Sequence, residues 1–274
     1  MAMICPHCKT KIEGSVRFCP ECGADLGEVI RIDGQRKQML KSASGASFAL
    51  GQAARQARLD AVYSPEEIIS ARLYNLIMLG VLLWGLLVNV LLCVFAADFA
   101  MQLNPLVLLI LYLVCAFVGI RVARRSRRAI VSFLGYNLVV VPFGLMLSVM
   151  LSAYGGIRSS VVADAFLYTL LITVGMGAVT LIAPGFFERI GGALLGCLIG
   201  LIVCEIVLLL FRVNQVVTDW VAAALFSLYI GYDIHRSQQF AKTVDNAVDC
   251  ALDIYLDVAN LFIRLLEIMG RKRD

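Results

Sequence analysis

The sequence predicts an all-α membrane protein, a bundle of seven transmembrane helices with a small metal-binding module at its N-terminus. Three observations predict this fold class. The chain is 60% hydrophobic and has a mean hydropathy of +0.84. Its apolar residues gather after position 70 into runs of about 20, the length that crosses a hydrocarbon core. Four cysteines in two Cys-x-x-Cys pairs lie near the start of the chain, in a segment with almost no residues to form a core.

The first span follows the residues Ser64-Pro65-Glu66-Glu67. This order places a serine at the N-cap, a proline at the first helical position and a glutamate three residues after the cap, which is typical of a helix start. The run begins too late in the chain for a cleaved signal peptide. We expect membrane spans at 73–96, 105–120, 130–152, 165–183, 190–211, 213–232 and, interrupted by acidic residues, 247–269.

Positive charge in the loops predicts the orientation of the bundle. Five arginines lie between 121 and 128, after the second span, while the loops of the opposite side offer only Arg158 and Arg212. The arginine loop and the N-terminus are therefore expected in the cytoplasm. Seven complete spans would place the basic tail 271–274 outside the cytoplasm, although positively charged segments next to a span usually lie inside it. Either this charge is too small to matter, or the last segment does not cross completely.

The cysteine pairs of the N-terminal module are ten residues apart. Four thiolates at this spacing fit a tetrahedral zinc ion, whose binding energy replaces the missing core. Because thiolates fill all four positions, the zinc is expected to be structural, and disulfides are disfavoured in a reducing cytoplasm. Residues 4–26 resemble the zinc-ribbon modules of many bacterial membrane proteins, which contact proteins or nucleic acid. The expected zinc ligands are Cys5, Cys8, Cys19 and Cys22.

The cysteine pairs and the apolar runs divide the chain into four parts. The segment after the zinc ribbon mixes Gly, Ser, Ala, Gln and basic residues, and is expected to be a linker with one short surface helix near 48–62. For the zinc ribbon we expect an unidentified cytoplasmic protein partner, in preference to nucleic acid. The expected parts are a zinc ribbon at 1–26, a linker at 27–63, a membrane domain at 64–270 and a tail at 271–274.

The fifth span carries a stripe of small residues and one acid. Gly192, Gly196 and Gly200 recur every four residues and form a face that a second helix can approach closely. Glu205 on this span and Arg264 on the last span lie at similar distances from the outer end of their helices. We predict that Glu205 and Arg264 form an ion pair, because each is costly alone in lipid. In the alternative, both side chains extend to the membrane interface.

Two aspartates interrupt the last two apolar runs. Asp233 closes the run 221–232, and Asp257 lies inside 251–268. Their midpoint, Asp245, belongs to a polar stretch, so a helical hairpin folded about it would bring both carboxylates to the same depth. A paired carboxylate site inside a membrane is therefore our leading functional hypothesis. In the alternative, the pair is hydrogen bonded and only fixes the packing of the helices.

The last span carries an aspartate at every fourth position. A four-residue step turns a helix about 40° beyond one full turn, so these acids form a slowly winding stripe. Such a stripe does not face lipid, which places the last helix in the middle of the bundle or beside water. Two carboxylates at one depth would share a proton and titrate as a unit, and they suit hard cations such as calcium. The stripe is Asp245, Asp249, Asp253 and Asp257, of which Asp249 and Asp253 form an acidic mouth.

The residues around these aspartates resemble the closing signature of the Bax inhibitor-1 family, also called the transmembrane Bax inhibitor motif family. The resemblance rests on 229–234 (Tyr-Ile-Gly-Tyr-Asp-Ile) and on 251–262. It implies a bacterial inner-membrane bundle with a central last helix, and a pH-sensitive calcium leak in which Asp233 and Asp257 are proton sensor and gate. It also implies a latch arginine at the cytoplasmic end of the second helix, with Arg125 favoured and Arg121 next. Deprotonation of the two aspartates would loosen this latch.

Two other classes of function are a non-conducting membrane protein and an enzyme. The alternative to a channel is a non-conducting membrane regulator or scaffold that recruits a partner through the zinc ribbon. Enzymatic activity is not expected. The only histidine outside the N-terminal module is His235, at a helix end, and no Gly-x-Ser-x-Gly motif, phosphate loop or second metal site is present in the sequence.

Overall fold

The computed structural model describes residues 2–4, 11–13, 67–126, 128–211 and 213–271. The chain divides into two compact units, Met1–Asp60 and Ala61–Asp274. In the first unit, strand β1 (Ala2–Ile4) pairs antiparallel with β2 (Lys11–Glu13), with Met3 opposite Ile12. The four predicted zinc ligands and the predicted linker lie outside the described residues.

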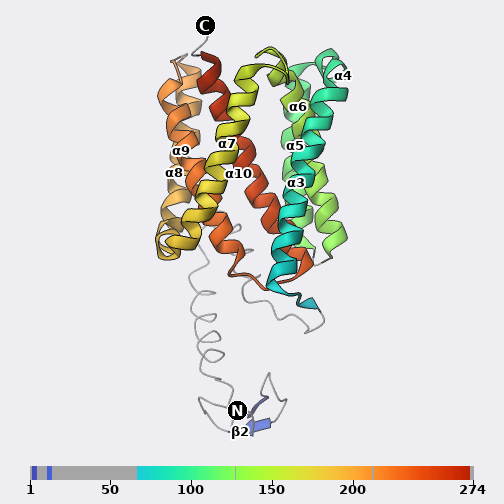
Figure 1. The fold of residues 1–274 in the computed structure, drawn as a ribbon, viewed down its shortest axis with the longest axis vertical. Coiled ribbons are helices and arrows are strands. Elements are labelled where there is room, and N and C mark those ends of the chain that lie inside the picture. Colours follow the sequence, from blue (N-terminus) through green and yellow to red (C-terminus); the bar gives the residue numbers. More distant parts are fainter. Residues whose placement is uncertain (1, 5–10, 14–66, 127, 212, 272–274) are drawn as a thin grey trace. The chain divides into compact units, whose positions relative to one another are not determined.

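The second unit is helical throughout its described part, apart from short connections (Figure 1). Seven of its helices have 21 to 28 residues, and each coincides with one predicted span. By length and composition five of them, α3 and α5 to α8, are candidate membrane spans, while α9 and α10 are less apolar on average. The helices are α3 (Ala71–Phe95), α4 (Ala97–Gln102), α5 (Pro105–Arg125), α6 (Ala129–Ser152), α7 (Ser160–Ile182), α8 (Pro184–Leu210), α9 (Val216–Ser237) and α10 (Val244–Arg271).

Local sequence explains most helix starts, and one expected start is wrong. Asn104 caps α5 by accepting a hydrogen bond from the backbone N–H of Leu106, with Pro105 as the first helical residue. The predicted cap Ser64 lies outside the described residues, and α3 begins later, capped by Ser70. The motif Ser-Pro-Glu-Glu therefore does not mark the start of α3, because a serine nearer the apolar run caps it.

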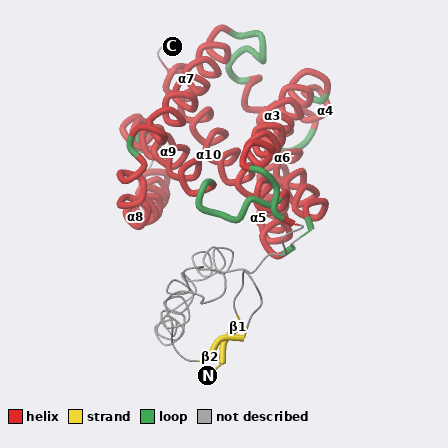
Figure 2. The backbone as a smooth tube through the Cα atoms, turned by 60° about the horizontal axis from the view of Figure 1, so that its bottom comes forward, coloured by secondary structure: helices red, strands yellow, loops and turns green. Residues whose placement is uncertain are grey.

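Helix α10 lies in the middle of the described bundle (Figure 2). It packs against α9, α3, α7 and α6, and 18 of its 28 residues are buried. By contrast α8 lies at the periphery and buries only Phe187, Leu194 and Leu201. Apolar residues on the outside of such a bundle are the surface that lipid requires. A central α10 also keeps its aspartates away from that surface.

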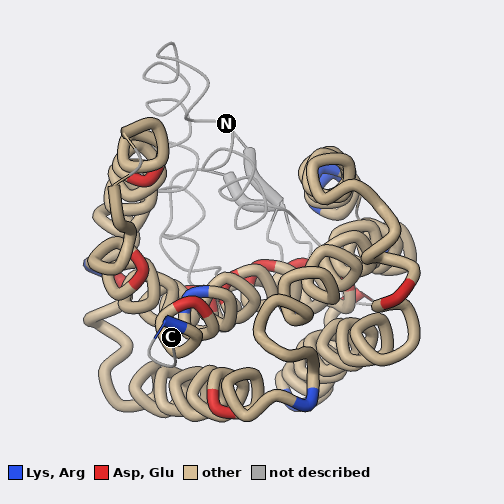
Figure 3. The backbone as a smooth tube through the Cα atoms, turned by 90° about the horizontal axis from the view of Figure 1, so that it is seen from above, with Lys and Arg blue, Asp and Glu red and all other residues tan. Residues whose placement is uncertain are grey.

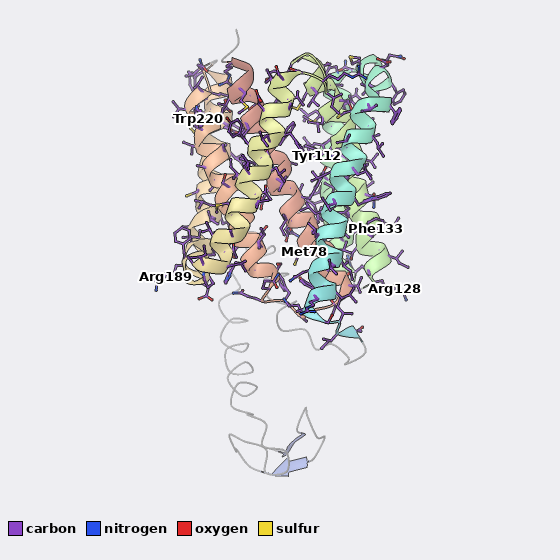
Figure 4. All side chains as sticks on the ribbon, in the orientation of Figure 1. Met78, Tyr112, Arg128, Phe133, Arg189 and Trp220 are labelled. Atoms are coloured by element: carbon purple, nitrogen blue, oxygen red, sulfur yellow. The ribbon has the colours of Figure 1, made fainter. Side chains whose placement is uncertain are left out.

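The positively charged loops lie at one end of the bundle. Arg128 and Arg189 are at the same end, and Trp220 lies toward the opposite end (Figure 4). The two arginines therefore lie on the same side of the bundle, and their location in the cytoplasm stays a prediction.

Two glycines permit a close contact between the backbones of α5 and α6. A Cβ atom built on Gly119 would lie 2.6 Å from the carbonyl oxygen of Gly135, and one on Gly135 would lie 2.7 Å from that of Gly119. The predicted stripe on α8 does not work in this way. Among the described residues nothing lies within 4 Å of a Cβ built on Gly192, Gly196 or Gly200. This stripe therefore packs against no other described helix.

Replacing Gly135 by alanine is expected to destabilise the bundle by about 1–3 kcal/mol, because the new methyl group overlaps the α5 backbone. The measurement is the thermal unfolding temperature of the full-length chain in detergent. Gly80→Ala is the matched control, because a Cβ there meets nothing within 4 Å. Equal unfolding temperatures for the two variants would contradict the close contact.

Candidate functional site

The helices α9 and α10, which end and begin at the same turn, carry six aspartates, of which Asp219 belongs to a second cluster described below. Asp233 on α9 is 8% exposed, and on α10 Asp249 is 4% and Asp257 8% exposed. Asp245 is buried as well, and Asp253 is partly buried. Viewed from the C-terminal side, acidic positions follow the central helix through the bundle (Figure 3). Ionisable groups inside a membrane bundle are costly, so their number marks this region as the candidate site.

The turn between α9 and α10 differs from the predicted one. It comprises residues 238–243, so Asp245 belongs to the first turn of α10 and is not the centre of the hairpin. At 1.5 Å per residue, Asp233 lies about 6 Å from the end of α9, and Asp257 about 20 Å along α10. Helix α10 crosses the bundle obliquely, from the lower end of α3 to the upper end of α9 (Figure 1). Sequence symmetry about Asp245 thus does not set the depth of the two carboxylates, and their equal depth stays a prediction.

Arg124 is the arginine that reaches the aspartates. Its Nη2 atom lies 2.6 Å from Oδ1 of Asp253, which joins α5 to α10. The charges of Asp253, Asp249 and Asp233 all act on its guanidinium. Arg124 thus contacts one carboxylate on α10 and lies within electrostatic range of Asp233 on α9.

The predicted latch arginines are placed differently. Arg125 and Arg121 are exposed, and neither makes a hydrogen bond or ion pair with another described residue. The reason is helical periodicity, because residues four apart share one face of a helix and this face of α5 points outward. Arg124 follows the buried Ala123 and so lies on the inner side of α5. Arg124 therefore replaces Arg125 and Arg121 as the arginine beside the aspartates.

Asp245 serves a local purpose at the start of α10. The hydroxyl of Ser132 on α6 contacts Oδ1 of Asp245, and it also lies 3.1 Å from the carbonyl oxygen of Ala123. An acid in the first turn suits the positive end of the helix dipole. Asp245 thus fixes the start of α10 against α6, as expected for a helix-start acid.

A second charged cluster ties α8, α9 and α10 together near the C-terminal end of α10. Arg264 Nη2 lies 2.7 Å from Oε1 of Glu205, which brings together the pair predicted from sequence. Arg264 Nη1 lies 2.9 Å from Oδ1 of Asp219 and 3.3 Å from Oε2 of Glu267. Arg271 contacts the other oxygen of Asp219 at 2.7 Å. Two arginines therefore hold three carboxylates, and the Asp219 side chain is only 1% exposed.

An aromatic layer fills the bundle between the two charged clusters. Asn89 on α3 donates a hydrogen bond of 2.7 Å to the hydroxyl of Tyr255 on α10. The Tyr255 ring lies 5.5 Å from that of Tyr136 and 6.0 Å from that of Phe143, both on α6. Along α10 Tyr255 lies between Asp253 and Asp257, so this layer separates Asp245, Asp249 and Asp253 from the Arg264 cluster.

Comparison with known families decides the identity of the helical unit. Residues 68–274 match the family model described as inhibitor of apoptosis-promoting Bax1. The chain belongs to the Bax inhibitor-1 family. The match begins just before α3 and covers all the helices. Residues 4–26 match a zinc-ribbon domain model, which agrees with the cysteine spacing and supports a structural zinc ion in this Bax inhibitor-1 protein.

Curated relatives of this Bax inhibitor-1 protein occur in two genera of bacteria. Uncharacterized proteins from two strains of Helicobacter pylori are each 39% identical over 85 residues, which is 30% of this chain and 36% of theirs. An uncharacterized protein of Campylobacter jejuni is 33% identical over 128 residues, 46% of this chain and 53% of its own. The matched segments thus span about half or less of these relatives' lengths.

Sequence reasoning missed three of the polar side chains that make the buried contacts described above in this Bax inhibitor-1 domain. Asp219 was overlooked because it lies at the start of an apolar run, where an acid suits a helix N-terminus. Asn89 was overlooked because a single amide in an apolar helix carries little signal. Arg124 was passed over among five neighbouring arginines. Within residues 67–126, 128–211 and 213–271 no group of three or more His, Cys, Asp or Glu side chains is arranged to hold a metal ion.

Proposed function

We propose that this Bax inhibitor-1 protein is a pH-sensitive cation leak of the bacterial inner membrane, with calcium as the permeant ion and the N-terminus in the cytoplasm. The observation that carries the proposal is the contact of Arg124 with Asp253 beside the buried Asp249 and Asp233. An arginine placed near several interior carboxylates makes the arrangement of α5 and α10 depend on how many of them are ionised. A helix bundle with a purely structural role would not need an arginine and several carboxylates in its interior.

The proposed mechanism begins with proton loss from Asp233 and Asp257. Each buried carboxylate that loses its proton adds a negative charge inside the bundle. The two new charges together attract the Arg124 guanidinium and compete with Asp253 for it, so both protons must leave before the path opens. The ion pair of 2.6 Å between α5 and α10 is thereby weakened, and a path opens beside α10. At low pH the neutral carboxyls leave Arg124 on Asp253, and the path stays closed.

Calcium fits the chemistry of this path. Carboxylate oxygens are the ligands that calcium prefers, and sites made of few carboxylates bind it weakly enough for release. Asp249 and Asp253 lie nearer the start of α10 than Asp257 does, so they form an acidic mouth that raises the local concentration of cations.

We include α9 and α10 among the spans, for a total of seven. Helix α10 has 28 residues and is about 42 Å long, more than a hydrocarbon core of about 30 Å. Its charged residues face partners on other helices, as do Arg264 with Glu205 and Arg271 with Asp219. Asp219 is the neighbour of Trp220, at the end opposite Arg128 (Figure 4). These pairings support a last helix that crosses completely.

The zinc ribbon favours a second candidate function. Its match at 4–26 supports a docking module in which Cys5, Cys8, Cys19 and Cys22 hold structural zinc. In that case the protein is a non-conducting membrane regulator that recruits a cytoplasmic protein. The two functions differ in one property, the passage of ions.

Calcium influx into lipid vesicles that contain the purified full-length chain tests the proposal. A calcium-sensitive dye inside the vesicles reports the initial rate of influx as the external pH is varied. The leak predicts influx that increases as pH rises, above that of protein-free vesicles. Influx equal to that of protein-free vesicles at every pH would favour the non-conducting regulator.

A further inference from the structure

One face of α10 is incompletely buried from Asp253 onward. The partly exposed residues recur at steps of three or four, which is the spacing of residues on one side of a helix. Phe262, on the opposite side, is the one other partly exposed residue between 253 and 267. At 1.5 Å per residue this stretch is about 21 Å long, most of the thickness of a hydrocarbon core. The open face consists of Asp253, Leu256, Asn260, Ile263, Arg264 and Glu267.

Helices α5 and α8 border this open face near its two ends. Arg124 of α5 contacts Asp253 at 2.6 Å, and Glu205 of α8 contacts Arg264 at 2.7 Å. Helix α5 packs mainly against α6, and α8 mainly against α9, and α5 and α8 make no extensive contact with each other within their described residues. Figure 2 shows them on opposite sides of α10. The described helices therefore cover the face of α10 between α5 and α8 only in part.

The polarity of the open face is unsuited to lipid. Side chains that face acyl chains are apolar, as are the exposed Leu83 of α3 and Ile110 of α5. On the open face of α10 only Leu256 and Ile263 are apolar. Charged and amide groups are costly in hydrocarbon but are solvated readily by water. The open face is therefore expected to be hydrated.

Asn260 lies in the middle of the open face, one helical turn from Asp257 and one from Arg264. Its amide nitrogen donates a hydrogen bond of 2.8 Å to the carbonyl oxygen of Leu256 in the same helix. Its amide oxygen accepts no hydrogen bond from any other described residue. Amide oxygens accept hydrogen bonds from water and are also ligands that calcium uses. Asn260 thus presents a neutral oxygen between two charged regions of α10.

The aromatic layer lies on another side of α10. Tyr255 is two residues from Asp253 and two from Asp257, so at about 100° per residue it is rotated by about 200° from each of them. Its ring packs against Tyr136 of α6, and its hydroxyl bonds to Asn89 of α3. The layer therefore separates the charged clusters on the side of α10 that faces α3 and α6, and it leaves the open face uninterrupted.

We propose that water fills the open face of α10 between α5 and α8, and that a cation moving along it is bound by the amide oxygen of Asn260. The hydrated face extends the proposed path from Asp253 to the cluster around Arg264. In that cluster three carboxylates contact two arginines, so the excess charge is negative when all are ionised and does not repel cations. The hydration is a property of the bundle itself. The role of Asn260 as a cation ligand rests on the proposed leak.

Cysteine labelling tests the hydrated face without reference to ion flux. A positively charged methanethiosulfonate reagent stays out of lipid and reacts with the thiolate, which forms where water can solvate it. The full-length variant Asn260→Cys is reconstituted into vesicles, and the reagent is applied to both sides. Val174→Cys is the control, because Val174 is 63% exposed in the interior of the apolar α7. Mass spectrometry of peptides locates the label, and labelling after unfolding in dodecyl sulfate confirms that each thiol is free.

Asn260→Cys is expected to react at least about tenfold faster than Val174→Cys, although Val174 is the more exposed residue, because only the first thiol meets water. Leu256→Cys places a thiol one turn earlier on the same face, leaves the amide in place and should also react rapidly. If Asn260→Cys and Leu256→Cys both react no faster than Val174→Cys, the hydrated face is overturned, whether or not the protein conducts calcium.

Calcium influx into vesicles tests Asn260 as a ligand. Asn260→Leu is expected to lower the initial rate at least about tenfold at every pH, as loss of one hydrogen-bonding group to a charged species predicts. The pH dependence should persist, because Asp233 and Asp257 are unchanged. Asn260→Asp keeps an oxygen ligand and should keep the influx. A rate in Asn260→Leu equal to that of the wild type would overturn the role of Asn260. Absence of influx in the wild type would instead reject the leak and this role with it, while labelling alone decides the hydrated face.

Discussion

Calcium influx through the Asp257→Asn variant is expected to be independent of pH. Asparagine keeps the size and most of the hydrogen bonding of aspartate but has no proton to lose, so the charge change proposed to open the path is absent. Asp257 lies in the interior of α10 and is 8% exposed, so it is largely shielded from solvent. The measurement is the initial rate of influx into vesicles over a range of pH, at equal amounts of reconstituted protein.

Two control variants sharpen this prediction. Asp164→Asn makes the same replacement at an exposed aspartate of α7 and should leave the pH dependence of influx unchanged. Asp257→Glu restores a titratable carboxyl and should restore a pH-dependent rate. A pH dependence in Asp257→Asn equal to that of the wild type would show that this aspartate is not the sensor.

Replacing Arg264 by leucine is expected to lower the free energy of unfolding by about 3–5 kcal/mol. The guanidinium contacts Glu205 at 2.7 Å and Asp219 at 2.9 Å, and the Asp219 side chain is 1% exposed. Without Arg264, these carboxylates lose a counter-charge in a region that water reaches poorly. Arg271 still neutralises one oxygen of Asp219, which limits the loss.

Thermal unfolding of the full-length chain in detergent measures this loss. Arg158→Leu removes an exposed arginine between α6 and α7, and should unfold near the wild-type temperature. The double variant Arg264→Leu with Glu205→Gln should recover part of the loss, because one unpaired charge is removed as well. An unfolding temperature of Arg264→Leu within error of Arg158→Leu would mean that the cluster contributes little to stability.

The helices of this domain could be predicted because lipid imposes one simple requirement. Every span needs about 20 apolar residues, and nothing in the chain competes with that signal. Each of the seven long helices coincides with a predicted run, although α5 and α10 extend further into their charged flanks. The central position of α10 was also predictable, because aspartates at every fourth residue exclude a lipid-facing helix.

The candidate site was predicted less completely, for physical reasons. Whether Arg124 or Arg125 points inward depends on the rotation of α5 about its axis, and a helix as apolar as α5 has no strong face to fix that rotation from sequence. The position of the turn was wrong because residues 244–249 are polar enough for a loop, yet form the first turns of α10. Side chains of α6, such as Ser132 beside Asp245, supply the partners that allow those polar residues to be helical and buried.

Unlike the choice between Arg124 and Arg125, the pairing of Glu205 with Arg264 could be inferred from the sequence. Each charge is expensive in lipid, so a single opposite charge at a similar depth sufficed to predict the contact. Asp219 joins the same cluster from α9, but its position in the first turn of a helix concealed it. A charged residue that the helix dipole already explains, such as an acid in a first helical turn, is therefore easily overlooked as a partner in an ion pair.

The central claim is that proton loss from interior aspartates opens a cation path beside α10. The most direct test is the initial rate of calcium influx into vesicles containing the wild-type chain, measured as the pH is raised and compared with Asp257→Asn in the same preparation. The account predicts a rate that increases with pH in the wild type and does not change with pH in Asp257→Asn. A wild-type rate equal to that of protein-free vesicles at every pH would contradict it.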